Sequence, residues 1–192
     1  MAEYWDARRE SLYYRAVFQV VSVVGRDAAS ILDVGSAETD YILWFHWIGR
    51  KVQLNTRFRS ELEGVERVRA NFFDWQPPEP FDVTMCLQVL EHITDAPAFC
   101  DRLKAASRRL VISVPYKWHG GTPGHVNDPV DETKLHQWMG LKPNYSMTVE
   151  EPFGPRRLIA YYDLVNGPKA RIPRAVAKEA IAEKGAAAHR FR

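Results

Sequence analysis

The sequence predicts a single α/β domain in which a mostly parallel sheet is covered by helices on both faces. Over the first 140 residues, short apolar segments with strand character alternate with helical or loop segments. Such alternation is typical of βαβ units. Two strand-like segments then follow each other with only the turn 151–155 between them, which leaves no room for a helix. They predict an antiparallel hairpin at the edge of the sheet.

The order of elements follows from hydrophobic periodicity and from residues that start or end helices. Residues 11–25 predict a helix, with Ser11 as N-cap and Gly25 as a stop. Residues 30–34 predict a buried strand, and residues 38–48 an apolar helix. The other expected strands are 52–55, 66–70, 81–87, 110–115, 145–150 and 157–165, and the other expected helices are 94–107 and 131–139.

Length and charge predict one domain followed by a basic tail. The 192 residues suit one compact domain, which we place at residues 1–167 with a core at 28–118 and a substrate loop and closing hairpin at 119–167. The Ala-rich tail 168–192 has seven Lys or Arg and two Glu, which gives it a net charge of +5. Because the whole chain has a net charge of +2, residues 1–167 have a net charge of −3. The domain itself therefore lacks the basic character that marks most nucleic-acid-binding folds.

Composition excludes several other classes of protein. Apolar residues make up 46% and charged residues 26%, as in ordinary globular domains. The longest apolar stretches, 17–24 and 41–48, are far too short to span a membrane. The N-terminus has no secretory signal pattern, and Cys86 and Cys100 lack the spacing of disulfide or metal motifs. A cytoplasmic location without a membrane span is the expectation.

The residues that follow the strands are the candidates for chemistry, because ligands of open parallel sheets bind at the carboxyl ends of the strands. After the first strand, Gly35 allows a close backbone approach, and the small residues Ser36 and Ala37 keep the space open. This loop leads into an expected helix N-terminus, which favours an anionic group. Asn55 ends the second strand, where nucleoside-binding sheets place a side chain that receives ribose hydroxyls.

Two motifs in a fixed order resemble those of a known family. Residues 31–36 (Ile-Leu-Asp-Val-Gly-Ser) form a glycine motif, and residues 81–93 (Phe-Asp-Val-Thr-Met-Cys-Leu-Gln-Val-Leu-Glu-His-Ile) follow at matching separation. With the fifth strand and the hairpin, they make residues 28–165 resemble class I S-adenosylmethionine-dependent methyltransferases. The resemblance implies a Rossmann-like fold with seven strands, and methyl transfer from S-adenosylmethionine to give S-adenosylhomocysteine. A nicotinamide-binding sheet expects a third glycine in the first turn, which is absent here.

The resemblance also implies a set of cofactor-binding residues. The chain departs from the family pattern at four positions: Ala37 and Thr39 replace glycines, and Asn55 and Asn71 replace acids. An amide oxygen still accepts a hydrogen bond but lacks the charge that makes such a bond roughly twice as strong. The implied contacts are Asp33, Gly35, Ser36 and Ala37 around the methionine end, Asn55 at the ribose, Asn71 and Phe72 at the adenine, and Leu87 and Gln88 beside the methionine and the sulfonium.

Histidines are the candidates for the acceptor side of the reaction. Methyl transfer is an in-line displacement that needs alignment rather than a side-chain nucleophile, but an oxygen acceptor benefits from a general base such as histidine. The segment 115–129 follows a strand and is rich in Gly, Pro, aromatic and polar residues, as active-site loops are. We select His125 first and His92 second. The expected reaction is O-methylation of a small-molecule or sugar-like acceptor.

Three alternatives remain open from sequence. Glu91, His92 and His125 partly resemble the ligands of metal-dependent RNA 2′-O-methyltransferases, but Gln88 stands where that pattern has a further glutamate, so no metal ligand is assigned. The changed glycine loop and the two asparagines favour a non-catalytic methyltransferase-like binding module. The tail 168–192 offers a contact for nucleic acid. No motif specifies a partner or an oligomeric state.

Overall fold

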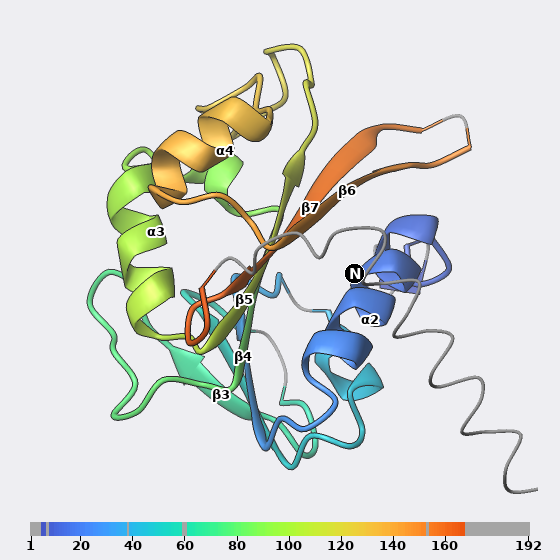
Figure 1. The fold of residues 1–192 in the computed structure, drawn as a ribbon. Coiled ribbons are helices and arrows are strands. Elements are labelled where there is room, and N and C mark those ends of the chain that lie inside the picture. Colours follow the sequence, from blue (N-terminus) through green and yellow to red (C-terminus); the bar gives the residue numbers. More distant parts are fainter. Residues whose placement is uncertain (1–4, 7, 38, 59–60, 153, 168–192) are drawn as a thin grey trace, which may run out of the picture.

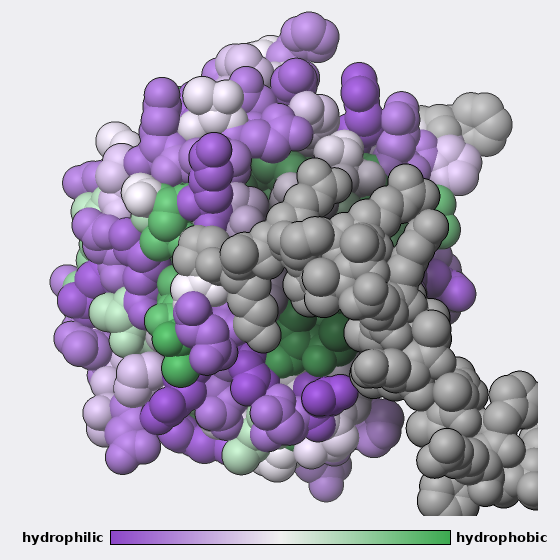
Figure 2. Space-filling view, viewed as in Figure 1, coloured by the Kyte–Doolittle hydropathy of each residue, from purple (hydrophilic) through white to green (hydrophobic). Residues whose placement is uncertain are grey.

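The structure is a computed structural model that describes residues 5–6, 8–37, 39–58, 61–152 and 154–167. The expected basic tail, residues 168–192, lies outside the described residues. No helix in the described part of the chain is long and apolar enough to cross a membrane. On the face in view in Figure 2, hydrophilic side chains dominate and apolar ones are exposed in limited areas.

The centre of the fold is a seven-stranded sheet with the strand order β3-β2-β1-β4-β5-β7-β6 (Figure 1). Strands β1 to β5 pair in parallel, whereas β7 is antiparallel to both of its neighbours. The predicted strands and the closing hairpin are therefore confirmed, with bounds that differ by one or two residues. The strands are β1 Ser30–Val34, β2 Arg50–Asn55, β3 Glu66–Arg69, β4 Val83–Leu87, β5 Arg109–Pro115, β6 Tyr145–Glu150 and β7 Arg156–Asp163.

Helices cover both faces of the sheet, as expected. Helix α2 (Leu12–Val24) lies on one face, and α3 (Ala96–Ala105) and α4 (Glu132–Met139) lie on the other (Figure 1). Each face has its own cluster of buried apolar side chains. All three helices have side-chain N-caps: Ser11, Asp95 and Asp131. The two cysteines, Cys86 and Cys100, are buried free thiols.

The helix expected over residues 38–48 is wrong. The described part of this segment contains only a 3-10 helix, η1 (Tyr41–Trp44), followed by turns. Aromatic and β-branched residues lose side-chain freedom in a helix and have modest helix propensity, so packing decides the conformation. Here Phe45 stacks on Phe18 of α2, with ring centroids 5.8 Å apart, and the buried Tyr41 donates a hydrogen bond to the Tyr14 carbonyl.

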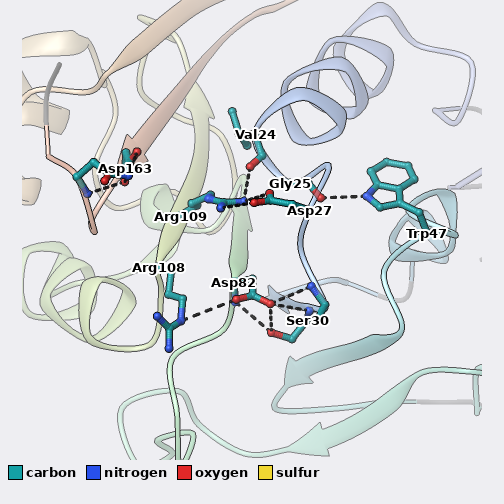
Figure 3. A network of polar contacts seen from close by, with 11 residues as sticks. Val24, Gly25, Asp27, Ser30, Trp47, Asp82, Arg108, Arg109 and Asp163 are labelled. Atoms are coloured by element: carbon teal, nitrogen blue, oxygen red, sulfur yellow. Dashed lines mark hydrogen bonds and ion pairs between the residues drawn. The ribbon is translucent and has the colours of Figure 1, made fainter. Parts of the chain in front are cut away.

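A polar network fastens α2 to the sheet at the edge opposite the carboxyl ends of β1 and β4 (Figure 3). Arg109 of β5 forms two hydrogen bonds with Asp27, at 2.5 and 3.0 Å, and donates a third to the Val24 carbonyl at the end of α2. Asp82 accepts hydrogen bonds from the backbone and hydroxyl of Ser30 at the start of β1. The network therefore fixes the C-terminal end of α2 relative to β5, and the start of β1 relative to Asp82.

Candidate active site

A cavity of about 630 Å³ lies at the carboxyl ends of β1 and β4. The chain leaves this pair of strands in opposite directions, to β2 on one side and to β5 on the other, so the cavity occupies the topological switch point of the sheet. Six residues predicted to bind the cofactor line it: Asp33, Gly35, Ser36, Ala37, Leu87 and Gln88. The structure therefore brings together the residues implied for the methionine end and the sulfonium.

The loop after β1 has a backbone that only small residues tolerate. Gly35 has a φ of 80°, and a Cβ placed on it would lie 2.6 Å from Cγ2 of Val89. Ala37 also has a positive φ, 47°, at a position where the sequence resemblance implies a glycine. Such conformations strain residues with side chains, and Ala37 therefore holds a backbone conformation that favours glycine.

Two buried polar side chains face the cavity from this strand and loop. Asp33 is 3% exposed and Ser36 is 6% exposed. Burial raises the pKa of Asp33 to about 7, an effect that a hydrogen bond with Gln53 only partly offsets. The Ser36 hydroxyl has no hydrogen-bond partner among the described residues. A buried polar atom without a partner is costly, so this hydroxyl marks a place where a ligand atom is expected.

A second wall of the cavity joins β4, β5 and α2. Gln88 follows β4 with a φ of 56° and donates from Nε2 to Oγ of Ser113, at 3.1 Å. The hydroxyl of Tyr13 on α2 also hydrogen-bonds to Ser113, which is fully buried. A positive φ in a residue other than glycine is uncommon and clusters at functional sites. The network therefore holds Gln88 and Tyr13 in fixed positions beside the cavity.

The closing hairpin contributes four cavity residues that sequence reasoning missed, of which Glu151 and Arg157 are charged. Glu151 accepts hydrogen bonds from the backbone N–H groups of Leu12 and Tyr13, at 3.1 and 2.9 Å, at the positive end of the α2 dipole. Arg157 lies with its guanidinium carbon 4.8 Å from the Tyr13 ring centroid. A signal existed: a strand antiparallel to its neighbours begins at the edge where the parallel strands end, so its first residues belong to the site.

The remaining residues implied by the resemblance lie elsewhere. Asn55 and Asn71 each accept a hydrogen bond from a backbone N–H in their own turn, those of Thr56 and Phe73. Phe72 is 4% exposed and belongs to the core on the α3 side. Asn55, Asn71 and Phe72 are not among the residues that line the cavity. Their ribose and adenine contacts stay predictions.

The two selected histidines lie together, His92 in the segment after β4 and His125 within the loop that follows β5. Nδ1 of His125 is 2.7 Å from a carboxylate oxygen of Asp128, and the His125 side chain is only 7% exposed. Nδ1 of His92 is 2.9 Å from the Gly124 carbonyl. The ring centroids are 4.7 Å apart at an interplanar angle of 89°. Neither ring lines the cavity, but Trp118 stacks on His125, at 5.8 Å, and Arg157 lies 5.9 Å from the Trp118 ring.

The buried Glu91 completes a group of possible metal ligands. One ligand atom each of Glu91, His92 and His125 lies within 4.8 Å of the others. Burial raises the pKa of Glu91 to about 8, and its Oε2 has no hydrogen-bond partner among the described residues. Since both histidines use Nδ1 for a hydrogen bond, Nε2 is the remaining ligand atom of each ring, as in many protein metal sites.

Comparison with solved structures identifies the class of fold. The chain has the fold of the class I S-adenosylmethionine-dependent methyltransferases. It is similar to 1,6-didemethyltoxoflavin-N1-methyltransferase from Burkholderia thailandensis, crystallised with 1,6-didemethyltoxoflavin and S-adenosylhomocysteine. The two are 19% identical, and the match covers 81% of this chain and 80% of that one with a TM-score of 0.68.

Two further structures support this assignment of the fold. The N-methyltransferase NodS from Bradyrhizobium japonicum, in complex with S-adenosylhomocysteine, is 14% identical over 79% of this chain and 87% of that chain, with a TM-score of 0.62. Magnesium protoporphyrin IX methyltransferase from Synechocystis PCC 6803, with bound S-adenosylmethionine, is 15% identical over 78% of each chain, with a TM-score of 0.55. No protein-family model and no curated protein sequence matches the chain.

Proposed function

We propose that this protein is an S-adenosylmethionine-dependent methyltransferase that methylates an oxygen of a small-molecule or sugar-like acceptor. The observation that carries the proposal is the cavity at the β1 and β4 ends, where Gly35 and the Ser36 hydroxyl meet in one concave site. The structures with similar folds include proteins crystallised with S-adenosylmethionine or S-adenosylhomocysteine, which supports the choice of cofactor.

The cavity suits the methionine end of this cofactor. Asp33 offers a carboxylate for an ammonium group, and the Ser36 hydroxyl is a buried polar atom with no partner among the described residues. The glycine backbone at position 35 leaves space that a Cβ would occupy. The bound cofactor supplies an electrophilic methyl carbon. This chain has to hold the acceptor in line with that carbon and exclude water.

The pair His125 and Asp128 supports an oxygen acceptor. An Nδ1–H donated to Asp128 leaves Nε2 of His125 as the basic atom, because the hydrogen bond fixes the tautomer. Nε2 is then the atom that accepts the hydroxyl proton of the acceptor. His92, fixed by the Gly124 carbonyl, lies against the His125 ring and serves as the second candidate.

Calorimetric titration tests the cofactor first. We expect S-adenosylhomocysteine to bind the wild-type protein with micromolar affinity, and His125→Ala to bind it within about 3-fold of that affinity, because His125 does not line the cavity. Absence of binding by a protein shown to be folded would instead support the non-catalytic methyltransferase-like module.

A second candidate function is metal-assisted methylation of RNA at the 2′-oxygen, because one observation favours it. Glu91, His92 and His125 present three ligand atoms within 4.8 Å, and hydrogen bonds orient both rings. A metal ion there would bind an acceptor hydroxyl and lower its pKa. Gln88, whose amide donates to Ser113, does not add a carboxylate to this group.

Metal titration separates the two candidates. In the metal-assisted case, Mn²⁺ or Zn²⁺ binds the wild-type protein, both His92→Ala and His125→Ala weaken the binding at least 10-fold, and a short RNA acquires a methyl group only with the metal. If neither ion binds, the metal-assisted function is excluded and the general-base function of His125 remains.

A further inference from the structure

Arg157 is a cation in the cavity wall that forms no ion pair with any of the residues the structure describes. It lies near the start of β7, is half-buried, and lines the cavity. It has no ion pair or side-chain hydrogen bond among the described residues, and its Nε is buried without a partner. Its neighbours are the rings of Tyr13 and Trp118, whose centroids lie 4.8 and 5.9 Å from the guanidinium carbon. The rings hold the guanidinium in place but do not neutralise it.

The carboxylates near Arg157 bind other groups or do not pair with it. Glu151 accepts two N–H groups at the start of α2, and Glu10 pairs with Arg15. Glu91 forms neither an ion pair nor a hydrogen bond with Arg157, and the Oε2 atom of Glu91 and the Nε atom of Arg157 have no hydrogen-bond partner among the described residues. A half-buried guanidinium with an unused donor favours an oxyanion as ligand, since charged hydrogen bonds to carboxylate or phosphate are the strong ones.

The position of Arg157 points to the acceptor rather than to the cofactor. In the strand order β1-β4-β5-β7, the loop with Gly35 and Ser36 follows β1, three strands away from Arg157. At a strand spacing of ~4.8 Å, this separation is about 14 Å across the sheet. Leu87 and Gln88, implied to lie beside the sulfonium, follow β4 and lie between the two. Arg157 is therefore on the far side of the sulfonium position from the methionine end.

We propose that the methyl acceptor carries an oxyanion, either a carboxylate or a phosphate, and that Arg157 binds this group. The inference rests on the proposed function and specifies the substrate class of the same cavity. The aromatic rings of Tyr13 and Trp118 exclude water around the guanidinium, which strengthens its interaction with an anion.

The test uses small anions as probes on the protein saturated with S-adenosylhomocysteine. Benzoate, inorganic phosphate and the neutral analogue benzamide are titrated against wild type, Arg157→Met and Arg157→Lys. Methionine keeps the apolar stem of arginine and removes the charge. Arg156→Met is the matched control, because Arg156 is the neighbouring residue, is exposed and does not line the cavity. Thermal unfolding confirms that each variant folds.

We expect benzoate or phosphate, but not benzamide, to bind the wild type, and Arg157→Met to weaken this binding at least 10-fold. Arg156→Met should leave it unchanged, and Arg157→Lys should retain part of it. Binding of benzoate would identify the oxyanion of the acceptor as a carboxylate, and binding of inorganic phosphate would identify it as a phosphate. The inference is overturned if neither anion binds, if Arg157→Met binds the anion normally, or if Arg157→Met weakens S-adenosylhomocysteine at least 10-fold, which would assign Arg157 to the cofactor carboxylate. Failure of the wild type to bind S-adenosylhomocysteine is a separate result, against the proposed function.

Discussion

At the scale of single residues, Gly35 is the position least tolerant of change. Its φ of 80° and the 2.6 Å approach of Val89 to a built Cβ mean that even alanine strains the loop. A left-handed conformation costs a residue with a side chain about 1–2 kcal/mol. We expect Gly35→Ala to lower the melting temperature by several degrees and to weaken S-adenosylhomocysteine binding at least 10-fold, as measured by thermal unfolding and calorimetry.

A double variant separates the two causes of that effect. Val89→Ala in the Gly35→Ala background removes the steric contact but leaves the backbone strain, so we expect only partial recovery of the melting temperature. Full stability and full binding in Gly35→Ala alone would show that the loop adapts without cost.

The buried Asp33 predicts a pH dependence of stability. Its folded pKa of about 7 is raised above the ordinary value of 3.8, so the carboxyl favours folding only when protonated. Its contribution is fully present below about pH 4 and is lost as the pH rises through 7. We expect Asp33→Asn to flatten the fall in melting temperature between pH 5 and 8, and to raise the melting temperature at pH 8 above that of wild type.

The control for this prediction is an exposed acid. Asp74→Asn changes a surface carboxyl and should leave the pH profile as it is in wild type. Glu91, whose pKa of about 8 is also raised, contributes in the same direction up to a higher pH. If the melting temperature of Asp33→Asn changes with pH in the same way as that of wild type, folding does not favour the protonated form of the Asp33 carboxyl.

His125 predicts a separation of binding from turnover. With an identified acceptor, we expect His125→Ala to reduce kcat about 100-fold, which is within the range of rate acceleration that general bases provide. Asp128→Asn should lower kcat by a smaller factor with KM little changed, because it disturbs the ring's tautomer rather than removing the base. Normal turnover by His125→Ala in a steady-state assay would mean that another group accepts the proton.

At the scale of elements, Arg109 ties α2 to β5. It hydrogen-bonds to Asp27 and to the last turn of α2 and is less exposed than Arg108, which only approaches Asp82 at 3.8 Å (Figure 3). We expect Arg109→Met to lower the melting temperature by several degrees, and Arg108→Met to lower it by less than about two degrees. Equal effects of the two variants in thermal unfolding would show that the Arg109 contacts contribute no more to stability than those of Arg108.

The elements themselves were predictable where local signals and packing agree. Ser11 and Gly25 mark the ends of α2, and the apolar stretches of β1, β4 and β5 are buried on both faces of the sheet, as their composition indicates. Residues 38–48 show the limit. Their apolar spacing fits a helix, yet stacking of Phe45 on Phe18 depends on a partner that only the tertiary structure provides.

The candidate site was predictable in part for the same reason. Asp33 to Ala37 and Leu87 to Gln88 occupy strand ends that the motif order already indicated. The hydrogen bonds from Tyr13 to Ser113 and from the α2 N-terminus to Glu151 join segments about 100 and 140 residues apart, and no local pattern signals such pairs. No motif marks Arg157, and only the antiparallel direction of β7 places the first residues of that strand beside the cavity.

At the scale of the whole molecule, ligand binding should stabilise the fold. A ligand that binds only the folded state, at 100 times its dissociation constant, raises the free energy of unfolding by about 2.7 kcal/mol. We expect S-adenosylhomocysteine to produce a rise in melting temperature that grows with its concentration, with adenosine alone giving a smaller one. No shift at any concentration would favour a binding module with no cofactor.

The Glu151 carboxylate also connects the closing hairpin to a helix near the start of the chain. It accepts hydrogen bonds from two backbone N–H groups of α2, from 138 and 139 residues further along the chain. Contacts of such separation form late, because the intervening chain must be ordered first. A chain that has formed α2 and β1 therefore lacks this part of the cavity wall until β7 has paired with β5, so the sheet and the binding site are completed together.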